Sequence, residues 1–207
     1  MVNVPCLSGQ RLAECKSLIL ENHYTHSWPS GKSIVFAFED AAIVFSIPSN
    51  CMISRWLVGV PNRVWELTRL WAPDGHRHNL LSQAIAYAVR EFHKLKLADA
   101  LISYADPNVG HSGGVYRAAS WVYLGQSEES RAYRGPDGQI LSRRKFHSGK
   151  NGMTKAQICA RGFTQLKLPG KERFARALTR TGKRGIAGRL RLLSNEGLTM
   201  TTPGSKP

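Results

Sequence analysis

Apolar residues in the first part of the chain follow two different periods. Between Ser8 and Asn22 they recur at helical spacing, and Ser8 itself can cap the helix. Lys32–Phe38 and Ala41–Ile47 are short apolar runs typical of strands. Only Glu39 and Asp40 separate the two runs, so the sequence predicts a tight hairpin here.

The middle of the chain alternates between strand and helix patterns, with turn residues between them. The pattern predicts strands at Val64–Trp71, Ala100–Tyr104, Val122–Leu124 and Arg143–Phe146, and helices at Leu80–Leu95, capped by Asn79, and Gly114–Trp121. Such alternation favours an α/β fold with a mixed central sheet flanked by helices.

The apolar pattern thins after about residue 149. We therefore expect a catalytic domain over residues 1–149, a basic extension over residues 150–192 packed on or beside it, and a flexible tail over residues 193–207. The formal net charge is +15, and residues 150–207 contribute +11 of it, from 13 Lys or Arg and 2 acidic residues. This imbalance sets the extension apart from the rest of the chain.

A basic segment of this kind predicts a polyanionic partner, because binding nucleic acid releases condensed counterions. Charge alone leaves open a disordered basic tail, or a patch for RNA or anionic lipid. Arg173, Arg176 and Arg180 recur at helical spacing and could form a basic stripe along phosphates. The candidate residues for double-stranded DNA are Arg143, Arg144, Lys145, Lys171, Arg173, Arg176, Arg180, Lys183 and Arg184.

Two features of the sequence bear on where the protein is located: the lack of a long apolar run and the lack of a secretory signal in its first residues. No apolar run approaches the roughly 18 residues of a membrane span, and the first residues do not resemble a secretory signal. We expect a cytoplasmic protein without a membrane partner. The four cysteines show no metal-binding spacing and are expected to be free thiols.

Asp106 is the strongest single candidate for chemistry. It follows a short buried strand, and ligands of open α/β sheets bind at the carboxyl ends of strands. A carboxylate there could act as a general base or as a metal ligand, and the alternative is an Asp-Pro turn that only closes a loop.

Other polar and aromatic residues near this strand are secondary candidates. Ser103, His111 and Ser112 flank Asp106. Glu66 and Arg69 face opposite sides if their strand is regular, and Arg69 could hold a carboxylate or phosphate of a donor. Trp28 and Trp71 are aromatic residues that could stack on a base, with a core role as the alternative for each.

The order of elements resembles the GNAT acetyltransferase fold, in which a strand leads into a helix that cradles a pyrophosphate. The resemblance implies that Tyr116 donates a proton to a leaving group. It also implies a phosphate site at residues 71–79, where Gly75, Arg77 and the helix N-terminus stand. This loop has one glycine and an acidic Asp74, which argues against acetyl-coenzyme A as donor.

A closer match lies in five blocks, in order: NHYTHSWPSGK, FSIPSN, WELTRLWAPDGH, SYADPNVGHSGGVYRAASWVYLGQ and FHSGK. These blocks resemble the phage Mom family over roughly residues 22–183. The resemblance implies an enzyme that converts adenine in DNA to N6-carbamoylmethyl-adenine and so shields phage DNA from restriction enzymes. It also implies bound iron, with His23, Tyr24, Asp106 and Tyr116 as site residues and ligands, and His26 as a weaker one.

Several points stay open. The donor of the added group could be a coenzyme A ester, an amino acid derivative or a charged tRNA, and the protein could be a homodimer. Two alternatives to the leading hypothesis are a conventional acyl-coenzyme A-dependent N-acyltransferase acting on a protein or small amine, and a non-catalytic DNA-binding protein. The leading hypothesis makes a geometric prediction: His23 and Tyr24 must meet Asp106 and Tyr116 in one cleft near the basic surface.

Overall fold

Six strands form a mixed sheet at the centre of the protein, whose computed structural model describes residues 10–147 and 152–195. In spatial order the strands are β1 (Ser33–Phe38), β2 (Ala41–Ser46), β3 (Val64–Trp71), β4 (Ala100–Ala105), β9 (Glu172–Ala177) and β5 (Val122–Gln126). β3 and β4 run parallel, and the other neighbouring pairs are antiparallel. The carboxyl ends of β3 and β4 therefore meet at one edge of the sheet.

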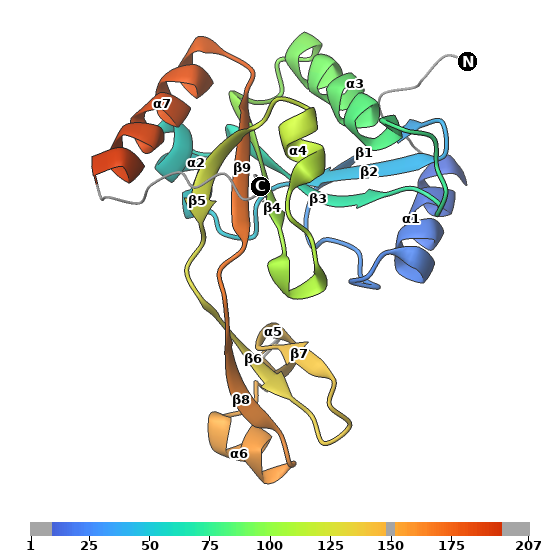
Figure 1. Ribbon diagram of the computed structural model, residues 1–207, viewed down its shortest axis with the longest axis vertical. Coiled ribbons are helices and arrows are strands. Elements are labelled where there is room, and N and C mark those ends of the chain that lie inside the picture. The colour runs from blue at the N-terminus through green and yellow to red at the C-terminus, as the bar shows by residue number, and fades with distance from the viewer. Residues whose placement is uncertain (1–9, 148–151, 196–207) are drawn as a thin grey trace, which may run out of the picture.

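Helices cover both faces of this sheet (Figure 1). They are α1 (Gln10–Asn22), α2 (Met52–Val58), α3 (Leu80–Lys94), α4 (Gly114–Ala118) and α7 (Arg180–Asn195). Because side chains alternate along a strand, Phe45 packs with α3 whereas its neighbour Val44 packs with α1. Ile102 faces α2 and α7 in the same way. The structure thus confirms the predicted α/β fold with a mixed, helix-flanked central sheet.

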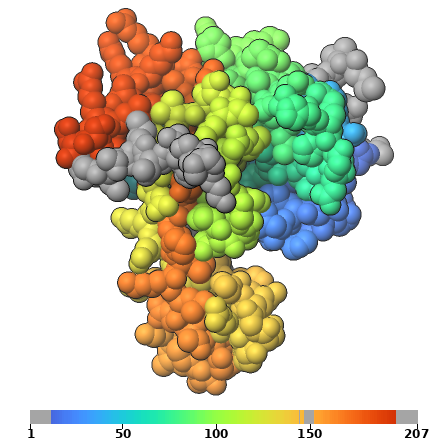
Figure 2. All heavy atoms as spheres, viewed as in Figure 1, coloured from blue at the N-terminus to red at the C-terminus, as the bar shows by residue number. Residues whose placement is uncertain are grey.

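A second, three-stranded sheet projects from this body, and we call it the arm, residues 130–168 (Figures 1 and 2). Its elements are β6 (Ser130–Arg134), β7 (Ile140–Ser142), α5 (Arg144–His147), α6 (Lys155–Ala160) and β8 (Thr164–Leu168). A small core folds the arm: Phe146 contacts the rings of Tyr133 and Phe163, with centroids 5.2 and 5.1 Å apart.

Two chain segments, residues 127–129 and 169–171, join the arm to the body, and we call them the neck. Ser127 and Lys171 hold them together, since the Ser127 amide donates to the Lys171 carbonyl at 2.8 Å and the Lys171 amide donates to Ser127 Oγ at 2.9 Å. Gly170 permits this crossing, because a Cβ there would lie 1.8 Å from the Ser127 carbonyl oxygen. The neck is therefore a close crossing of two backbones.

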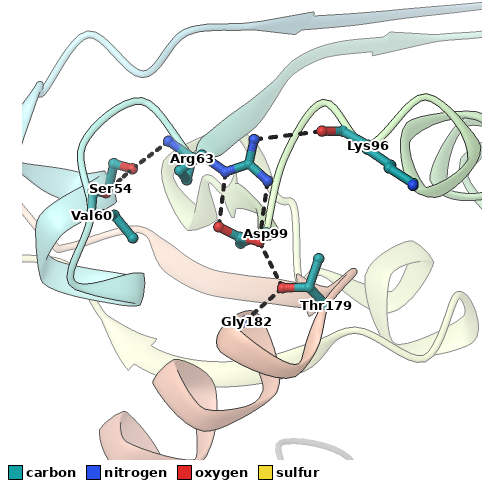
Figure 3. A network of polar contacts seen from close by, with 7 residues as sticks. All are labelled: Ser54, Val60, Arg63, Lys96, Asp99, Thr179 and Gly182. Carbon is teal, nitrogen blue, oxygen red and sulfur yellow. Dashed lines mark hydrogen bonds and ion pairs between the residues drawn. The ribbon is translucent and has the colours of Figure 1, made fainter.

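Asp99 lies directly before β4, at the end of the central strands that is opposite to Asp106, and its contacts hold this end together (Figure 3). Its carboxylate accepts hydrogen bonds from Arg63 Nε at 2.9 Å and Nη2 at 3.3 Å, and from Thr179 Oγ1 at 2.7 Å. Gly182 lies so close that a Cβ would stand 2.0 Å from the Asp99 carbonyl oxygen. The buried Asp99 carboxylate thus links the residues that directly precede β3, β4 and α7.

The first two-thirds of the chain largely follows the sequence prediction. The first hairpin, the β3 strand, the α3 helix and the β4 strand are confirmed, while α2 was not predicted. Asn79 stands at the start of α3, but its left-handed φ of 62° and the lack of a side-chain cap bond make the capping prediction wrong. The predicted helix from Gly114 ends at Ala118, because the chain turns there into β5.

The last third departs from the prediction. The expected strand Arg143–Phe146 is wrong, because β7 ends at Ser142 and Arg144 begins α5. The predicted helical stripe is also wrong, since Arg173 and Arg176 lie on β9 and only Arg180 lies on α7. β9 sits between β4 and β5, so residues 150–192 do not form an extension separate from the sheet. Ser8 and residues 196–207 of the expected tail lie outside the described residues, whereas residues 193–195 belong to α7.

The described helices also bear on whether the chain crosses a membrane. Within residues 10–147 and 152–195, no helix combines the length and apolar character that a bilayer span requires.

Candidate functional site

A cavity of about 370 Å³ opens beside the carboxyl end of β4. His23 and Tyr24, from the loop after α1, line one part of it. The loop from Gly110 to Gly114 and Tyr116 of α4 line another, and the sheet supplies residues such as Thr68. Two segments about 80 residues apart in the sequence therefore form one cavity, as the sequence predicted for three of its four central residues.

His23 directly follows α1, where its amide donates to the Ile19 carbonyl at 3.1 Å. Its Nδ1 lies 2.9 Å from Thr25 Oγ1 and 3.2 Å from the Thr25 amide nitrogen. When Nδ1 accepts from the amide, the proton of the neutral ring lies on Nε2; when Nδ1–H donates to Thr25 Oγ1, Nε2 is unprotonated and open to a ligand. Burial, together with the positive charge of Arg69, lowers the pKa of His23 to about 4. The imidazole is therefore neutral near pH 7.

Tyr24 lies beside His23 with ring centroids 4.5 Å apart, and it contacts the ring of His111 edge-on at 5.0 Å. Its side chain stays 45% exposed. Burial of the part around its hydroxyl raises the pKa of Tyr24. His111, which the sequence placed only near the site, is thus part of an aromatic cavity wall.

Tyr116 is buried, and its hydroxyl lies 2.8 Å from Ser103 Oγ, which also lies 2.8 Å from the Leu67 carbonyl oxygen. A carbonyl only accepts, so the Ser103 proton goes to Leu67 and the Tyr116 hydroxyl donates to Ser103. Burial raises the pKa of Tyr116 to about 12. The structure therefore keeps this phenol neutral and its oxygen fixed.

Asp106 follows β4 and caps the short helix η1 (Pro107–Val109). Its Oδ1 accepts from the Asn108 amide at 3.0 Å and from Asn108 Nδ2 at 2.8 Å, while Lys171 Nζ lies 2.7 Å from Oδ2. Burial opposes its charge, but the contacts with Lys171 and Asn108 hold the pKa of Asp106 below its usual value. Asp106 is not among the residues that line the cavity, and its carboxylate is turned to the neck.

Arg69 anchors the loop that carries His23 and Tyr24. Its Nε donates to the Ser27 carbonyl at 2.8 Å and its Nη2 to Ser27 Oγ at 3.0 Å, while Nη1 donates to the Thr68 carbonyl at 2.6 Å. All three guanidinium nitrogens are thus engaged with the protein.

The strand β3 is not regular at this point. Val44 pairs with Arg69 and Phe45 pairs with Leu67, so Thr68 is the extra residue of a bulge. Leu67 and Leu70 consequently share one face, and Glu66 and Arg69 share the other. The expectation that Glu66 and Arg69 face opposite sides is therefore wrong.

Residues predicted to bind a cofactor lie away from the cavity lining. Arg77 pairs with Glu39, at 2.8 Å from Nε and 2.6 Å from Nη2, and it also donates to Gln83. Gly75 occupies an open turn with φ of +75°. Trp28 and Trp71 pack against the cluster beneath α1, which favours their core role.

The predicted DNA-binding residues divide among four places. Arg143 and Lys145 are exposed on the arm, and the side chain of Arg144 lies outside the described ones. Lys171 is in the neck. Arg173 and Arg176, on β9, donate to the carbonyls of Gln126 and Ser120, both at 2.7 Å. Arg180, Lys183 and Arg184 are exposed on α7, at the opposite edge of the sheet from Asp106.

The contact between Lys171 and Asp106 was not predicted from the sequence. It arises because Ala105 pairs with Glu172 in the sheet, which brings Lys171 beside Asp106 although 65 positions separate them. Among the described residues, no group of three or more His, Cys, Asp and Glu is placed to hold a metal ion.

Known proteins provide an independent comparison. The sequence model of the Mom protein family matches residues 10–191. None of the curated proteins matches the chain. Among solved structures, the protein is similar to an N-acetyltransferase from Staphylococcus aureus Mu50, with a TM-score of 0.47 and 9% identity over 86% of this chain and 100% of that one.

Two further structures are similar at the same level. One is RimL, a ribosomal L7/L12 alpha-N-protein acetyltransferase, with a TM-score of 0.45 and 10% identity over 84% of this chain and 91% of that one. The other is an acetyltransferase of Bacillus subtilis in complex with CoA, with a TM-score of 0.42 and 10% identity over 84% and 95% of the two chains.

Proposed function

Because this chain belongs to the Mom protein family, we propose that it is an enzyme that converts adenine in DNA to N6-carbamoylmethyl-adenine and thereby protects phage DNA from restriction. The observation that carries the proposal is the cavity in which a neutral His23, the exposed ring of Tyr24 and the fixed phenol of Tyr116 come together. Family membership supplies the DNA modification, and the cavity supplies groups for the chemistry.

The cavity suits a base that has been turned out of the duplex. Its volume of about 370 Å³ falls within the roughly 300–1,000 Å³ of small-molecule sites. Tyr24 and His111 offer aromatic faces at the cavity wall, and flipped bases are held by stacking and by hydrogen bonds to their Watson–Crick edge. Unstacking the base costs a few kcal/mol, which such contacts offset.

The transfer requires one proton to leave the adenine amine and one leaving group to depart. The amine nitrogen forms a bond to the methylene carbon of a carbamoylmethyl donor, and the bond from that carbon to the leaving group breaks with its electron pair. His23 Nε2 accepts the amine proton in the neutral tautomer whose Nδ1–H donates to Thr25 Oγ1. The protonated Tyr116 hydroxyl turns its O–H from Ser103 to the leaving group and supplies the proton, and the Ser103 hydroxyl turns from Leu67 to donate to the phenolate oxygen that results.

Asp106 acts through its neighbours in this proposal. Lys171 and Asn108 already engage its carboxylate, so it is a poor first acceptor for the amine proton. Burial raises the pKa of Tyr24, and there the positive charge of Lys171 outweighs the opposing negative charge of Asp106. Asp106 thus orients the neck through its contact with Lys171.

The iron that the family resemblance implies has three donors within the cavity. His23 Nε2 and the hydroxyls of Tyr24 and Tyr116 are nitrogen and oxygen ligands of the kind that suit a hard cation, and they line one cavity. Because a metal-bound nitrogen or phenol oxygen cannot also transfer the protons described above, His23 and Tyr116 would serve as ligands instead of base and acid in the metal-loaded protein. The fourth expected ligand, Asp106, is paired with Lys171 instead. A bound metal would act as a Lewis acid on the donor.

The identity of the donor is a separate part of the proposal. Arg77 is engaged by Glu39 and Gln83, so it offers no open cation for a pyrophosphate. This favours a donor other than a coenzyme A ester, such as an amino acid derivative or a charged tRNA.

The test is nucleoside mass spectrometry of DNA from cells that express the protein. We expect an adenine nucleoside in which a carbamoylmethyl group replaces one amine hydrogen. Tyr116→Phe should reduce its amount at least about a hundredfold, the usual effect of losing a general acid. Tyr87→Phe should not, because the ring of Tyr87 packs on Phe36 and Phe38 and does not line the cavity. Iron analysis of the same proteins, purified without chelators or nickel resin, should find metal in the parent. Unmodified adenine in the presence of soluble parent protein contradicts the function, and iron-free active protein contradicts the metal.

A further inference from the structure

The arm carries far more positive charge than its size suggests. Residues 130–168 contain nine Lys or Arg and a single acidic residue, Asp137. Every one of these cations whose side chain is described is exposed. Asp137 accepts from the Gln139 amide within its own turn, and its single negative charge offsets only one of the nine positive charges. In Figure 2 the arm stands out from the body as a lobe accessible to solvent.

Two of these cations lie opposite each other on neighbouring strands, which lowers the stability of the arm when no anion is bound to it. Arg131 of β6 pairs directly with Lys167 of β8, and like charges opposite each other on neighbouring strands destabilise a sheet. Glu129 in the neck is the counter-charge of Lys167 among the described residues, at 3.5 Å and with both side chains largely exposed. A phosphate backbone bound across the two strands would remove this repulsion.

The arm is also held next to the cavity. Lys171 of the neck contacts Asp106, and the arm ends only three residues earlier, at Leu168. An extended segment of that length spans roughly 10 Å. The exposed cations of α7, by contrast, lie beyond the Asp99 end of β4, which is six residues or roughly 20 Å farther along the strand.

From charge, pairing and position together, we propose that the arm grips the phosphate backbone of duplex DNA beside the cavity, while the cationic residues of α7 take no part in this contact. The inference rests on the proposed function for its substrate. Duplex DNA carries one charge per roughly 1.7 Å of its axis, so about 10 Å of duplex alongside the neck presents several phosphates to the arm. These contacts position the duplex without reading its sequence.

Two triple variants with the same loss of charge test the proposal. The arm variant is Arg131→Gln, Arg143→Gln and Lys145→Gln; the α7 variant is Arg180→Gln, Lys183→Gln and Arg184→Gln. All six side chains are exposed, so each variant should unfold within about 1 kcal/mol of the parent. Affinity for a short fluorescent duplex is measured by anisotropy at several salt concentrations.

We expect the arm variant to bind the duplex at least about tenfold more weakly. Its slope of log K against log salt should fall by up to roughly 3, since each lost phosphate contact removes about 0.9. The α7 variant should bind like the parent. A second arm variant, Arg131→Lys with Arg143→Lys, keeps the charge of the parent protein and should retain most of the parent's affinity for the duplex.

Two results overturn the proposal: equal weakening by both variants, or a loss confined to the α7 variant. Unfractionated tRNA serves as a second probe. If the arm variant loses tRNA but keeps the duplex, the arm serves an RNA partner and the proposal is wrong. Binding is measured without turnover, so this outcome is independent of whether modified adenine is found.

Discussion

Gly113 shows how one backbone position holds the Tyr116 side of the cavity. Its φ of +74° lies in the left-handed region, and a Cβ there would lie 2.3 Å from the ring of Phe174. Phe174 in turn packs against Tyr116 with ring centroids 5.2 Å apart. Both the strain and the collision are therefore transmitted to the residue that we propose as proton donor.

Gly113→Ala is expected to lower stability by about 2–4 kcal/mol, the combined size of backbone strain and overpacking, and to reduce adenine modification. Gly59→Ala is the matched control, because its φ is +78° but nothing lies within 4 Å of the added Cβ. It should cost about 1 kcal/mol and leave modification unchanged. Denaturant unfolding and nucleoside analysis of both variants measure the difference, and equal behaviour would show that Phe174 does not hold Tyr116.

The central residues of the site differ in how far the sequence could reveal them. Asp106 directly follows a buried apolar strand, and the family resemblance predicted that His23, Tyr24 and Tyr116 lie in the same site. The partner of Asp106 could not be found in this way, because Lys171 reaches it through the register of β4 with β9. Nor could the engagement of Arg69, which depends on the bulge at Thr68.

Among the strands and helices, those with strong local patterns were predicted well. The β1–β2 hairpin follows from two apolar runs with a two-residue turn, and α3 from a long amphipathic period. β9 was missed because its arginines suggested an exposed segment. Its Phe174 and Ala175 are fully buried, while Arg173 covers the ring of Trp56 at 4.6 Å. β9 forms a strand because it pairs with β4 and β5, and a local apolar pattern cannot reveal pairing with segments so far away in the sequence.

The junction of β3, β4 and α7 makes a prediction about acid stability. The hydrogen bonds from Arg63 and Thr179 lower the pKa of Asp99 in the folded protein. Its stabilisation is therefore present above the unfolded pKa of about 3.9, and it is lost as the pH falls through the folded pKa.

Asp99→Asn should lower the free energy of unfolding by about 2–3 kcal/mol at pH 7, since it weakens hydrogen bonds to a charged group. The gap between variant and parent should close below roughly pH 4. Asp40→Asn, in the exposed β1–β2 turn, should change stability by less than about 0.5 kcal/mol at every pH. A pH-independent gap in urea unfolding would contradict the role assigned to the Asp99 carboxylate.

The neck joins the body and the arm, so their relative placement depends on the close approach of the two backbones at Gly170. A Cβ at Gly170 would lie 1.8 Å from the Ser127 carbonyl oxygen, which forces the two neck segments apart and draws Lys171 from Asp106. Gly182→Ala creates a comparable collision, at 2.0 Å from the Asp99 carbonyl oxygen, but at the other edge of the sheet. The two variants therefore separate lost stability from lost placement of the arm.

Gly170→Ala should weaken duplex binding and adenine modification together and expose the neck to protease, because the arm keeps its own aromatic core but no longer stands beside the cavity. Gly182→Ala should lower the unfolding midpoint at least as much, yet leave duplex affinity intact below that midpoint. If Gly170→Ala changes only stability, as Gly182→Ala does, then the arm and the cavity act independently and the contact between Lys171 and Asp106 serves the fold alone. Limited proteolysis, anisotropy and nucleoside analysis on the same two proteins decide between these outcomes.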